Sequence, residues 1–220
     1  MFFKNLFKPR WQHTNPEIRR QALDALDPHD RDTLKRVAQE DPEPALRLLA
    51  LHRLWDLSLL DRLAHYDHDS SVREQAAQRF LEIMAGVYST GPSLQERLIW
   101  LGKMQDPAIR LHLLRHGAEV ALRNAILEQV TDEEILGDVA INDRDARLRA
   151  IALGRVHGKG TLERIAKGAR NRDKEVSRTA KERLAVLLEE EARPQRLRLQ
   201  GQELCADAEA LGRRGRWQDA

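Results

Sequence analysis

The sequence predicts an all-α protein, a right-handed α-solenoid of about six to seven helical hairpins. Three observations predict this fold class. Apolar–Arg dipeptides recur at a nearly constant spacing, small residues recur at a fixed distance after them, and only 5% of the residues are aromatic. With Gly 12 and Pro 8, the 220-residue chain also has too few turn residues for an all-β protein.

An apolar residue followed by Arg recurs with steps of 26 or 28 residues and one step of 50. The five dipeptides are Ile18-Arg19, Leu46-Arg47, Val72-Arg73, Leu122-Arg123 and Leu148-Arg149. A variant follows at Val176, where Arg178 is displaced by one position. Because the step of 50 is about twice the period, one poorly matching repeat that contains LQERLIWLGKM is expected inside it.

Each dipeptide opens an apolar stripe with a small residue in its middle. Four positions after the apolar residue come Ala22, Ala50, Ala76, Ile126, Ala152 and Ala180. Eight positions after it come Leu26, Leu54, Phe80, Val130, Val156 and Leu184. Residues at these spacings lie along one face of a helix, and the small residue lets a second helix approach closely.

The gaps between these stripes contain a second pattern. Leu34-Val37-Ala38-Asp41 recurs at 60–67 and 136–143, and after Leu162 with Asn171 one residue late. Each repeat is therefore expected to be a longer first helix, a short turn and a second helix of about ten residues. Helix starts are expected at Pro16, Pro42 and Pro107, with N-caps Asn15, Asp41 and Asp106 just before them.

The stretch HYDHD, residues 65–69, has two interpretations: a metal site or a turn between helices. Asp67 occupies the same place in the pattern as Asp41 and Asp143, so its carboxylate is expected to cap exposed N–H groups. A metal site would need further ligands with supporting contacts. His112 and His116 also stand four apart, but the glutamate of a zinc-protease motif is missing between them. No metal and no cofactor are expected.

Four segments, NPEIRRQALDAL, DPEPALRLLALHRL, DHDSSVREQAAQRFL and DRDARLRAIALGRV, resemble HEAT-like repeats of the short, bilin-lyase type. The resemblance covers roughly residues 15–188. It implies a scaffold whose concave face binds a protein, in a class where a minority bind DNA, including alkyl-base glycosylases, or act as lyases. Fold alone constrains function only loosely.

The same resemblance implies a ladder of arginines paired with aspartates of adjoining repeats. The arginines would be Arg19, Arg47, Arg73, Arg123 and Arg149, and the acids Asp41, Asp67, Asp143 and Asp145. Such an arginine can lay its methylenes on apolar neighbours and present a planar fork to a carboxylate. Phosphate binding by the same arginines is the alternative.

The two ends of the chain, MFFKNLFKPRWQH and LGRRGRWQDA, are similar to a bacterial family of unknown function that joins such repeats to a long charged helical part. Residues 1–14 are expected to form a capping arm, with membrane-surface contact by Phe2, Phe3, Leu6 and Phe7 as the alternative. Residues 15–188 form the repeat domain. Residues 189–220 are expected to be a helix, a Gly-Arg turn and a new helix starting at Trp217, the beginning of a further region of a longer protein.

The net charge of +2 hides an asymmetry, because residues 21–143 carry net −9 and residues 144–198 carry net +8. Seven residues could form one basic edge: Lys159, Lys167, Arg170, Arg172, Lys174, Arg178 and Lys181. Such an edge is typical of nucleic-acid binding, here limited to the backbone because no aromatic residue accompanies it. The alternatives are a salt-bridged helix face and a dock for an acidic partner. HGKG, residues 157–160, lacks the spacing of a phosphate-binding Walker loop.

The single cysteine, Cys205, excludes an intramolecular disulfide and fits a reducing compartment. No apolar run approaches the ~20 residues of a membrane span, and the N-terminus lacks the features of a secretory signal, so we predict a cytoplasmic protein. Trp55 and Trp100 are expected in the core. The predicted function is a non-enzymatic scaffold with a protein partner. Nucleic-acid binding is the alternative, and a DNA-glycosylase-like enzyme, which needs an aromatic residue facing a carboxylate, is a more distant one.

Overall fold

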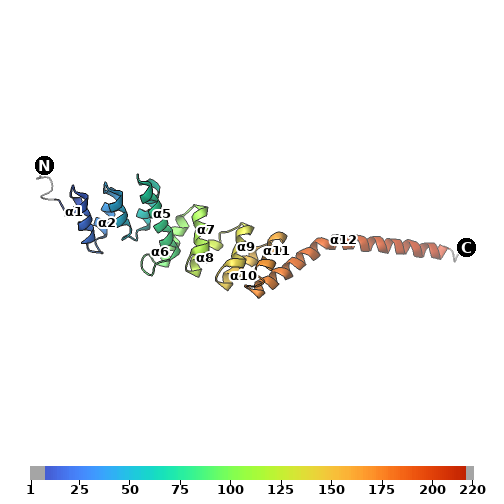
Figure 1. The fold of residues 1–220 in the computed structure, drawn as a ribbon. Coiled ribbons are helices and arrows are strands. Elements are labelled where there is room, and N and C mark those ends of the chain that lie inside the picture. The colour runs from blue at the N-terminus through green and yellow to red at the C-terminus, as the bar shows by residue number, and fades with distance from the viewer. Residues whose placement is uncertain (1–7, 217–220) are drawn as a thin grey trace. The chain divides into compact units, whose positions relative to one another are not determined.

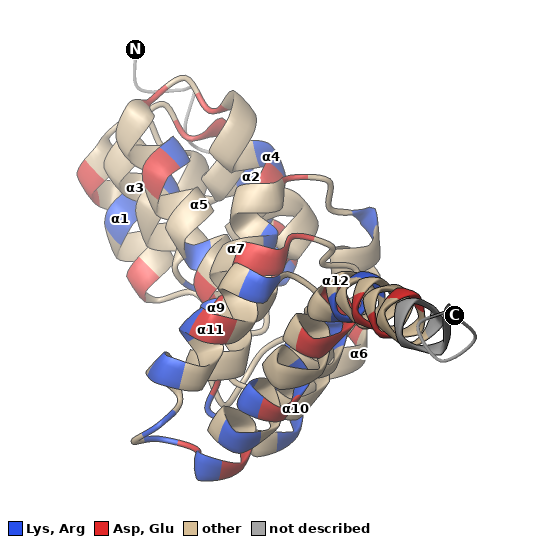
Figure 2. Cartoon of the chain, turned by 90° about the vertical axis from the view of Figure 1, so that its right-hand side faces the viewer, with Lys and Arg blue, Asp and Glu red and all other residues tan. Residues whose placement is uncertain are grey.

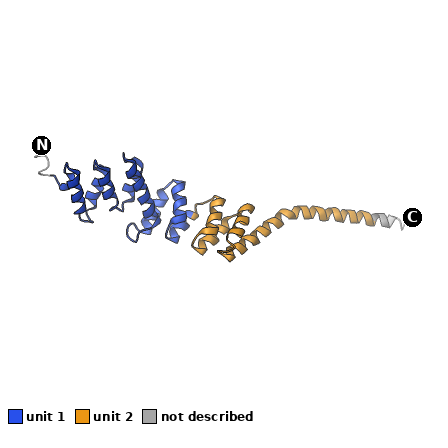
Figure 3. Cartoon of the chain, viewed as in Figure 1, with its two compact units in different colours: residues 1–126 blue, residues 127–220 orange. Residues whose placement is uncertain are grey.

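The structure, a computed structural model, describes residues 8–216, and the side chains of residues 8–211. Over this range it contains twelve α-helices, one short 3-10 helix and no strand (Figure 1). The all-α prediction is confirmed. The chain divides into two compact units, unit 1 (Met1–Ile126) and unit 2 (Leu127–Ala220), shown in Figure 3.

Unit 1 contains consecutive short helices joined by tight turns. They are η2 (Arg10–Gln12), α1 (Pro16–Asp24), α2 (Arg31–Glu40), α3 (Pro44–Leu51), α4 (Leu57–Tyr66), α5 (Ser70–Ala85), α6 (Leu94–Lys103), α7 (Pro107–His116) and most of α8 (Val120–Leu127). Helix α3 packs against α2 and also against α1 and α5, so first helices of successive repeats contact one another.

Unit 2 repeats this arrangement with fewer helices. They are α9 (Glu133–Asn142), α10 (Ala146–Arg155), α11 (Lys159–Gly168) and α12 (Lys174–Arg216). Helix α9 packs against α10 and α11, and α12 packs against α10 and α11. First helices therefore contact first helices, as in unit 1, and the second helices α9 and α11 also contact each other.

The apolar stripe found in the sequence lies in the core of each unit. Its buried members are Leu46, Ala50, Leu54, Val72, Ala76, Phe80, Leu122 and Ile126 in unit 1, and Leu148, Ala152, Val156, Val176 and Ala180 in unit 2. Ala50, Ala76 and Ala152 are fully buried. Short side chains at these positions let the neighbouring helix come close, as the spacing predicts.

Short polar side chains start most of the helices. Asn15 accepts a hydrogen bond from Glu17 N, and Asp106 accepts one from Ala108 N, so these two N-caps are as predicted. Ser93 forms a capping box with Glu96 at the start of α6. The prediction at Pro42 is wrong: α3 begins at Pro44, and Asp41 instead ends α2 and accepts from Glu43 N at 2.9 Å.

The expected longer first helix is found only at α5 and α12, which have 16 and 43 residues. The first helices α1, α3 and α10 have 9, 8 and 10 residues, while α2, α4, α9 and α11 have 10 each. The first helices are short because their N-terminal acids lie in extended turn conformation rather than in the first helical turn.

The irregular repeat has a specific cause. Helix α5 is extended to 16 residues and ends at Gly86, whose left-handed φ of 75° closes the helix. Residues 87–93 then form a loop where other repeats have a second helix, and α6 follows as the next first helix. The sequence register is lost here because a loop replaces a helix.

Helix α12 differs from the C-terminal prediction. It is continuous over 43 residues, through Pro194 and Gly201, and has no turn before Arg216. The expected boundary at 188/189 therefore falls inside a helix, and the expected Gly-Arg turn is wrong. Leu, Ala, Glu and Arg favour helix strongly enough to carry it past these breakers, which cost about 1–3 kcal/mol each. Trp217 and Ala220 lie outside the described residues.

The described part of the capping arm is held by α1. Arg19 donates hydrogen bonds to the carbonyl oxygens of His13 and Thr14, and η2 packs against α1. Phe2, Phe3, Leu6 and Phe7 lie outside the described residues, so the choice between end-capping and membrane contact stays a prediction.

Candidate functional site

The predicted arginine ladder forms paired contacts between successive repeats. Arg19 donates to both carboxylate oxygens of Asp41 at 2.8 and 2.9 Å. Arg47 donates to both oxygens of Asp67 at 3.0 and 2.7 Å. Each arginine therefore holds the acid that begins the next repeat in a bidentate, charge-assisted contact.

The same arginines also hold their own turn. Arg19, Arg47, Arg73, Arg123 and Arg149 each donate from Nη1 to the carbonyl oxygens five and six residues earlier. These carbonyls belong to the turn before the first helix. In Arg19, Arg47 and Arg149 the Nε and Nη2 groups also bind a carboxylate, which leaves little of those three forks to hold a phosphate.

Two contacts of the ladder use acids that the sequence prediction did not include. Arg149 pairs with Asp173, with a shortest distance of 2.7 Å. Arg97, in the irregular repeat, pairs with Glu119. Asp173 and Glu119 stand three residues before the apolar position of the next first helix, whereas Asp41 and Asp67 stand five before it.

These two acids are held in their charged form. The pKa of Asp173 is lowered by hydrogen bonds from Val176 N and from Arg149. The pKa of Glu119 is lowered by the Arg97 guanidinium. Both carboxylates are structural parts of the repeat contact.

Three further members of the predicted ladder make the following contacts. Arg73 has no carboxylate within ion-pair distance among the described residues, because the loop before Ser93 replaces the helix that would supply one. Asp145 is the N-cap of α10 and accepts from Arg147 N and Leu148 N. Asp143 ends α9 and accepts from Asp145 N at 2.7 Å.

A second set of arginines, which the sequence analysis missed, satisfies the C-terminal ends of first helices. Its members, Arg53, Arg79, Arg155 and Arg183, each stand seven residues after the apolar stripe position. Arg53 donates to the carbonyl oxygens of Leu23 and Leu26 at 2.6 and 2.9 Å. The other three donate to the equivalent carbonyls of the preceding repeat: Leu54, then Leu127 and Val130, then Leu153 and Val156.

This second set forms a helix-capping contact between repeats. The last carbonyls of a helix have no N–H partner in the next turn of that helix. A cation near them also interacts favourably with the negative end of the helix dipole. The recurring arginine was visible in the sequence. Its acceptor is a backbone carbonyl, which any residue supplies, so no second pattern marked it.

The predicted basic edge is only partly brought together. Lys167, Arg170, Arg172 and Lys174 lie at the turn between α11 and α12 and are exposed. Lys159 lies at the other end of α11, about 12 Å away along the helix, and pairs with Glu191 at 2.9 Å. Arg178 and Lys181 follow on α12, where Arg178 lies 3.8 Å from Glu175 and Glu182. The ribbon in Figure 2 marks these charges by colour.

The α11–α12 turn is thus a group of cations that we call the basic turn: Lys167, Arg170, Arg172 and Lys174. Its nearest acid, Asp173, is bound to Arg149. Arg172 reaches only the side-chain oxygen of Asn142, at 3.5 Å. Arg149 therefore already neutralises the charge of Asp173, and the four cations of the basic turn are exposed to solvent.

The irregular repeat builds an aromatic cluster that the sequence analysis did not predict. Trp55 and Tyr88 meet edge to face at 5.2 Å, and the Arg79 guanidinium lies 4.7 Å from the Trp55 ring centre. Gly91 has a φ of 122°, and a Cβ there would lie 2.8 Å from the indole of Trp55. Only glycine lets the loop pass so close to the ring.

Beside this cluster lies a surface hollow of about 310 Å³, which we call the tryptophan hollow. It is lined by Trp55, Asp56, Leu57, Ser58, Pro92, Glu96, Ile99 and Trp100. Ile99 is 53% exposed, and both tryptophans are partly exposed, so Trp55 and Trp100 do not lie in the core as expected. Its lining combines the apolar side chains Trp55, Leu57, Pro92, Ile99 and Trp100 with a polar rim of Asp56, Ser58 and Glu96.

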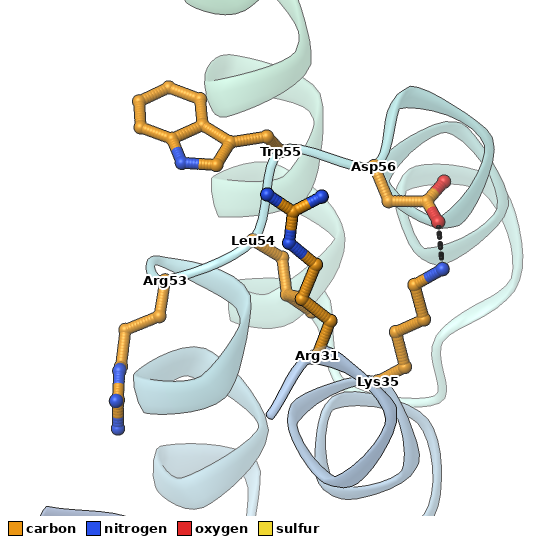
Figure 4. A pocket seen from close by; sticks show the side chains of 6 residues that line it. All are labelled: Arg31, Lys35, Arg53, Leu54, Trp55 and Asp56. Atoms are coloured by element: carbon orange, nitrogen blue, oxygen red, sulfur yellow. Dashed lines mark ion pairs between the residues drawn. The ribbon is translucent and has the colours of Figure 1, made fainter. Parts of the chain in front are cut away.

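Both acids at this rim are engaged. Burial raises the pKa of Asp56, but hydrogen bonds from Lys35 and from Leu59 N outweigh it and lower the pKa overall. Hydrogen bonds from the backbone N–H and the side chain of Ser93 lower the pKa of Glu96. Figure 4 shows a smaller hollow that Trp55 and Asp56 also line, where Lys35 reaches Asp56 at 2.7 Å.

The histidines and the cysteine form no reactive group within the described part of the chain. In HYDHD, Asp67 binds Arg47, and His65 Nδ1 lies 2.7 Å from the carbonyl oxygen of Asp61. Burial and the neighbouring His116 lower the pKa of His112. Among the described residues, no group of three or more His, Cys, Asp or Glu side chains is arranged to hold a metal ion. Cys205 is an exposed free thiol.

No protein-family model, curated protein or solved structure matches the chain. Of the helices described here, none combines the length and apolar character needed to cross a membrane.

Proposed function

We propose that this chain is a non-enzymatic HEAT-like scaffold, a right-handed α-solenoid of about six to seven hairpins that binds a protein partner on its concave face. The two arginine sets support the repeat architecture, because each recurs at one register in both units. The observation that carries the binding proposal is the tryptophan hollow. It is an open apolar surface that neither arginine set occupies.

The lining of this hollow suits an apolar side chain of a partner protein. Buried tryptophan at the centre of an interface, with a rim that excludes water, is a common source of binding energy. Trp55, Trp100 and Ile99 supply such a base. Asp56 and Glu96 are already bound to Lys35 and Ser93, so the rim does not demand a charged ligand.

The contacts that hold Asp56 and Glu96 also argue against the DNA-glycosylase alternative. The hollow does bring aromatic rings and carboxylates together, as that reaction requires. A catalytic carboxylate must accept or donate a proton at the substrate, whereas Asp56 and Glu96 cap α4 and α6. Their lowered pKa values keep them ionised and bonded to the protein.

The test compares two exposed isoleucines. A partner is captured with the full chain and purified, and its affinity is measured by calorimetry against Ile99→Glu and, as matched control, Ile151→Glu on α10, where Ile151 is 42% exposed. We expect Ile99→Glu and Trp100→Ala to weaken binding at least about tenfold and the control to bind normally. Equal affinity of Ile99→Glu and Ile151→Glu would overturn the proposal.

A second function, binding of a nucleic-acid backbone, is favoured by the basic turn. Lys167, Arg170 and Lys174 are exposed and have no carboxylate partner among the described residues. Backbone contacts release counterions, so binding of duplex or single-stranded DNA or RNA should weaken steeply with salt.

This candidate is tested by charge reversal at the turn. The triple variant Lys167→Glu/Arg170→Glu/Lys174→Glu should remove salt-sensitive binding, whereas Lys159→Glu/Lys181→Glu, away from the turn, should retain most of it. Absence of binding by the unmodified chain at low salt would exclude this function.

A further inference from the structure

Helix α12 extends far beyond the helices that pack against it. Its first turns are buried at Val176 and Ala180, and Glu191 still reaches Lys159 on α11. From residue 193 to residue 211 every side chain is exposed. This distal segment is about 27 Å long at the helical rise. Figure 1 shows the single long ribbon of α12.

The distal segment carries an apolar stripe at heptad spacing. Leu197, Leu204 and Leu211 stand seven residues apart and are 59%, 69% and 67% exposed. Gly201 and Ala208 lie between them on the same face. Leucine every seventh residue with small residues between is the pattern of a helix that packs closely against another helix. A Cβ on Gly201 would meet nothing within 4 Å, so the surface there is open.

The charges beside this stripe are arranged with opposite signs on the two sides of Gly201. The basic residues Arg193, Arg196 and Arg198 precede it, and the acidic residues Glu203, Asp207 and Glu209 follow it. Figure 2 shows both blue and red stretches on α12. Arg196 and Asp207 lie on the same flank of the stripe, within about 20° of each other around the helix axis.

This charge order selects one kind of partner. Two copies running in opposite directions about Gly201 place each basic block against the acidic block of the other copy. Two copies running in the same direction would place like charges together, which destabilises a coiled coil. The charge pattern of one distal segment therefore complements that of an identical segment running in the opposite direction.

We propose that the distal segments of two copies of this chain pair as antiparallel helices centred on Gly201. Leu197 of one copy then packs beside Leu204 of the second copy, and Arg196 faces Asp207 of the second copy. The exposed pair of Arg196 with Glu189 in the same chain, at 2.7 Å, is exchanged for this contact. The contact is isologous, as two-fold dimers require.

The first test is the mass of the full chain in solution by sedimentation equilibrium. We expect a concentration-dependent species of twice 25.3 kDa. Leu204→Glu should weaken association at least about tenfold. Leu199→Glu is the control for the same substitution on the other side of the helix, where Leu199 is 58% exposed. A monomer at all concentrations, or equal effects of the two variants, would overturn the proposal.

Charge exchange tests the selection of the second copy. Arg196→Asp and Asp207→Arg should each weaken the dimer, and the double variant should recover it because the complementary signs are restored. A double variant weaker than either single one contradicts the facing pair. Unchanged far-ultraviolet circular dichroism shows that the helix persists in each variant.

Disulfide trapping tests the direction. In a Cys205→Ser background, three samples are oxidised: the Leu197→Cys chain alone, the Leu204→Cys chain alone, and a mixture of the two chains. The antiparallel dimer places residue 197 beside residue 204 of the second copy, within the 4–7 Å Cα separation of a disulfide, and leaves the two copies of residue 197 about 12 Å apart. Preferential trapping in the mixture supports the proposal. Preferential trapping of Leu197→Cys with itself indicates a parallel pair and overturns it.

Discussion

The turns that lead from a second helix to the next first helix differ between the two units. In unit 1 they carry acidic residues and no lysine or arginine; the acids are Glu40, Asp41, Glu43, Asp67, Asp69 and Glu119. In unit 2 the same turns carry Asp143, Asp145 and Asp173 together with Arg144, Arg170, Arg172 and Lys174. Both kinds of turn nevertheless contain an acid that binds an arginine of the preceding repeat, Asp67 in unit 1 and Asp173 in unit 2.

The difference separates what the fold needs from what it tolerates. Asp67 and Asp173 both bind a ladder arginine and both accept a backbone N–H, in unit 1 and unit 2 respectively. The cations of the basic turn make no comparable contact. The acids are therefore structural in both units, and the cations are an addition specific to unit 2, which is where a function should be sought.

The largest expected effect comes from breaking the shared structural contact. Arg47 and Asp67 are 10% and 5% exposed in their side chains, so Arg47→Ala leaves a buried carboxylate without its cation. We expect a loss of about 3 kcal/mol in the free energy of unfolding. Arg149→Ala in unit 2, at a slightly more exposed pair, should cost somewhat less. Urea unfolding with hydrogen exchange measures the loss and assigns it to a unit.

Arg73→Ala is the matched control for both variants. Arg73 donates to the carbonyls of Asp67 and His68, the equivalents of those that Arg47 contacts in its own turn, but holds no carboxylate, so about 1 kcal/mol is expected. A large effect of Arg47→Ala with none for Arg149→Ala would show that the acids have different roles in the two units. The comparison between the turns would then fail.

The second arginine set should give a smaller and more even effect. Arg53→Ala in unit 1 and Arg183→Ala in unit 2 each remove the guanidinium donor from two helix-end carbonyls, of which Leu23 and Leu153 keep a backbone N–H donor. We expect a loss of about 1–3 kcal/mol for each in urea unfolding, because each removes hydrogen bonds from a charged donor. Substitution by Lys should recover only part, since a single ammonium cannot span both carbonyls as the fork does. Equal stability of the Lys and Arg forms would contradict this geometry.

The sequence predicted those contacts between repeats in which both partners are side chains of a recurring residue type. Arg19 and Asp41 recur together, so their contact was expected from the resemblance to HEAT-like repeats. Arg53 recurs as regularly, but its acceptors are backbone carbonyls and carry no residue signature. The tryptophan hollow was not predicted because Trp55 and Trp100 come together only when a loop replaces a helix, and Gly91 takes a left-handed φ.

The predicted helix boundaries were wrong where the cost of a proline or glycine is smaller than the helix preference of the residues around it. Asp41-Pro42 looked like a helix start, yet Pro44 also suits a first turn and begins α3. Pro194 and the glycines of GRRGR looked like an end of the helix, yet α12 continues. A local signal of about 1–3 kcal/mol decides a boundary only where the surrounding residues are neutral.

Exchanging the turn charges tests whether exposed cations suffice for anion binding. Glu40 and Glu43 in unit 1 are exposed and are not part of the ladder. Glu40→Lys/Glu43→Lys should give unit 1 a turn like that of unit 2 and raise the affinity for duplex DNA by about tenfold at low salt. Glu74→Lys/Gln78→Lys, on the exposed side of α5, adds three positive charges away from the turns, where the turn variant adds four, and serves as control. If both variants bind equally, net charge rather than the turn is what matters.

The smallest expected effect is the pH dependence of the acids Glu119 and Asp173. The pKa of Glu119 is lowered by Arg97, and that of Asp173 by Val176 N and Arg149. A carboxyl whose pKa is lower in the folded chain adds stability above its unfolded pKa, and that stability is lost as the pH falls through the folded pKa. Both are partly exposed, so each should add below about 1 kcal/mol.

Glu119→Gln and Asp173→Asn should each flatten the fall in urea stability between pH 5 and pH 3, about the range where such carboxyls titrate. A second measurement, of anion binding at pH 7, should distinguish the two units. Asp173→Asn removes a negative charge from the basic turn, so it should strengthen anion binding while it weakens the fold. The turn of Glu119 contains no lysine or arginine, so Glu119→Gln should weaken the fold without strengthening anion binding. Equal anion affinity of the two variants would show that the cations of unit 2 act independently of the acid they surround.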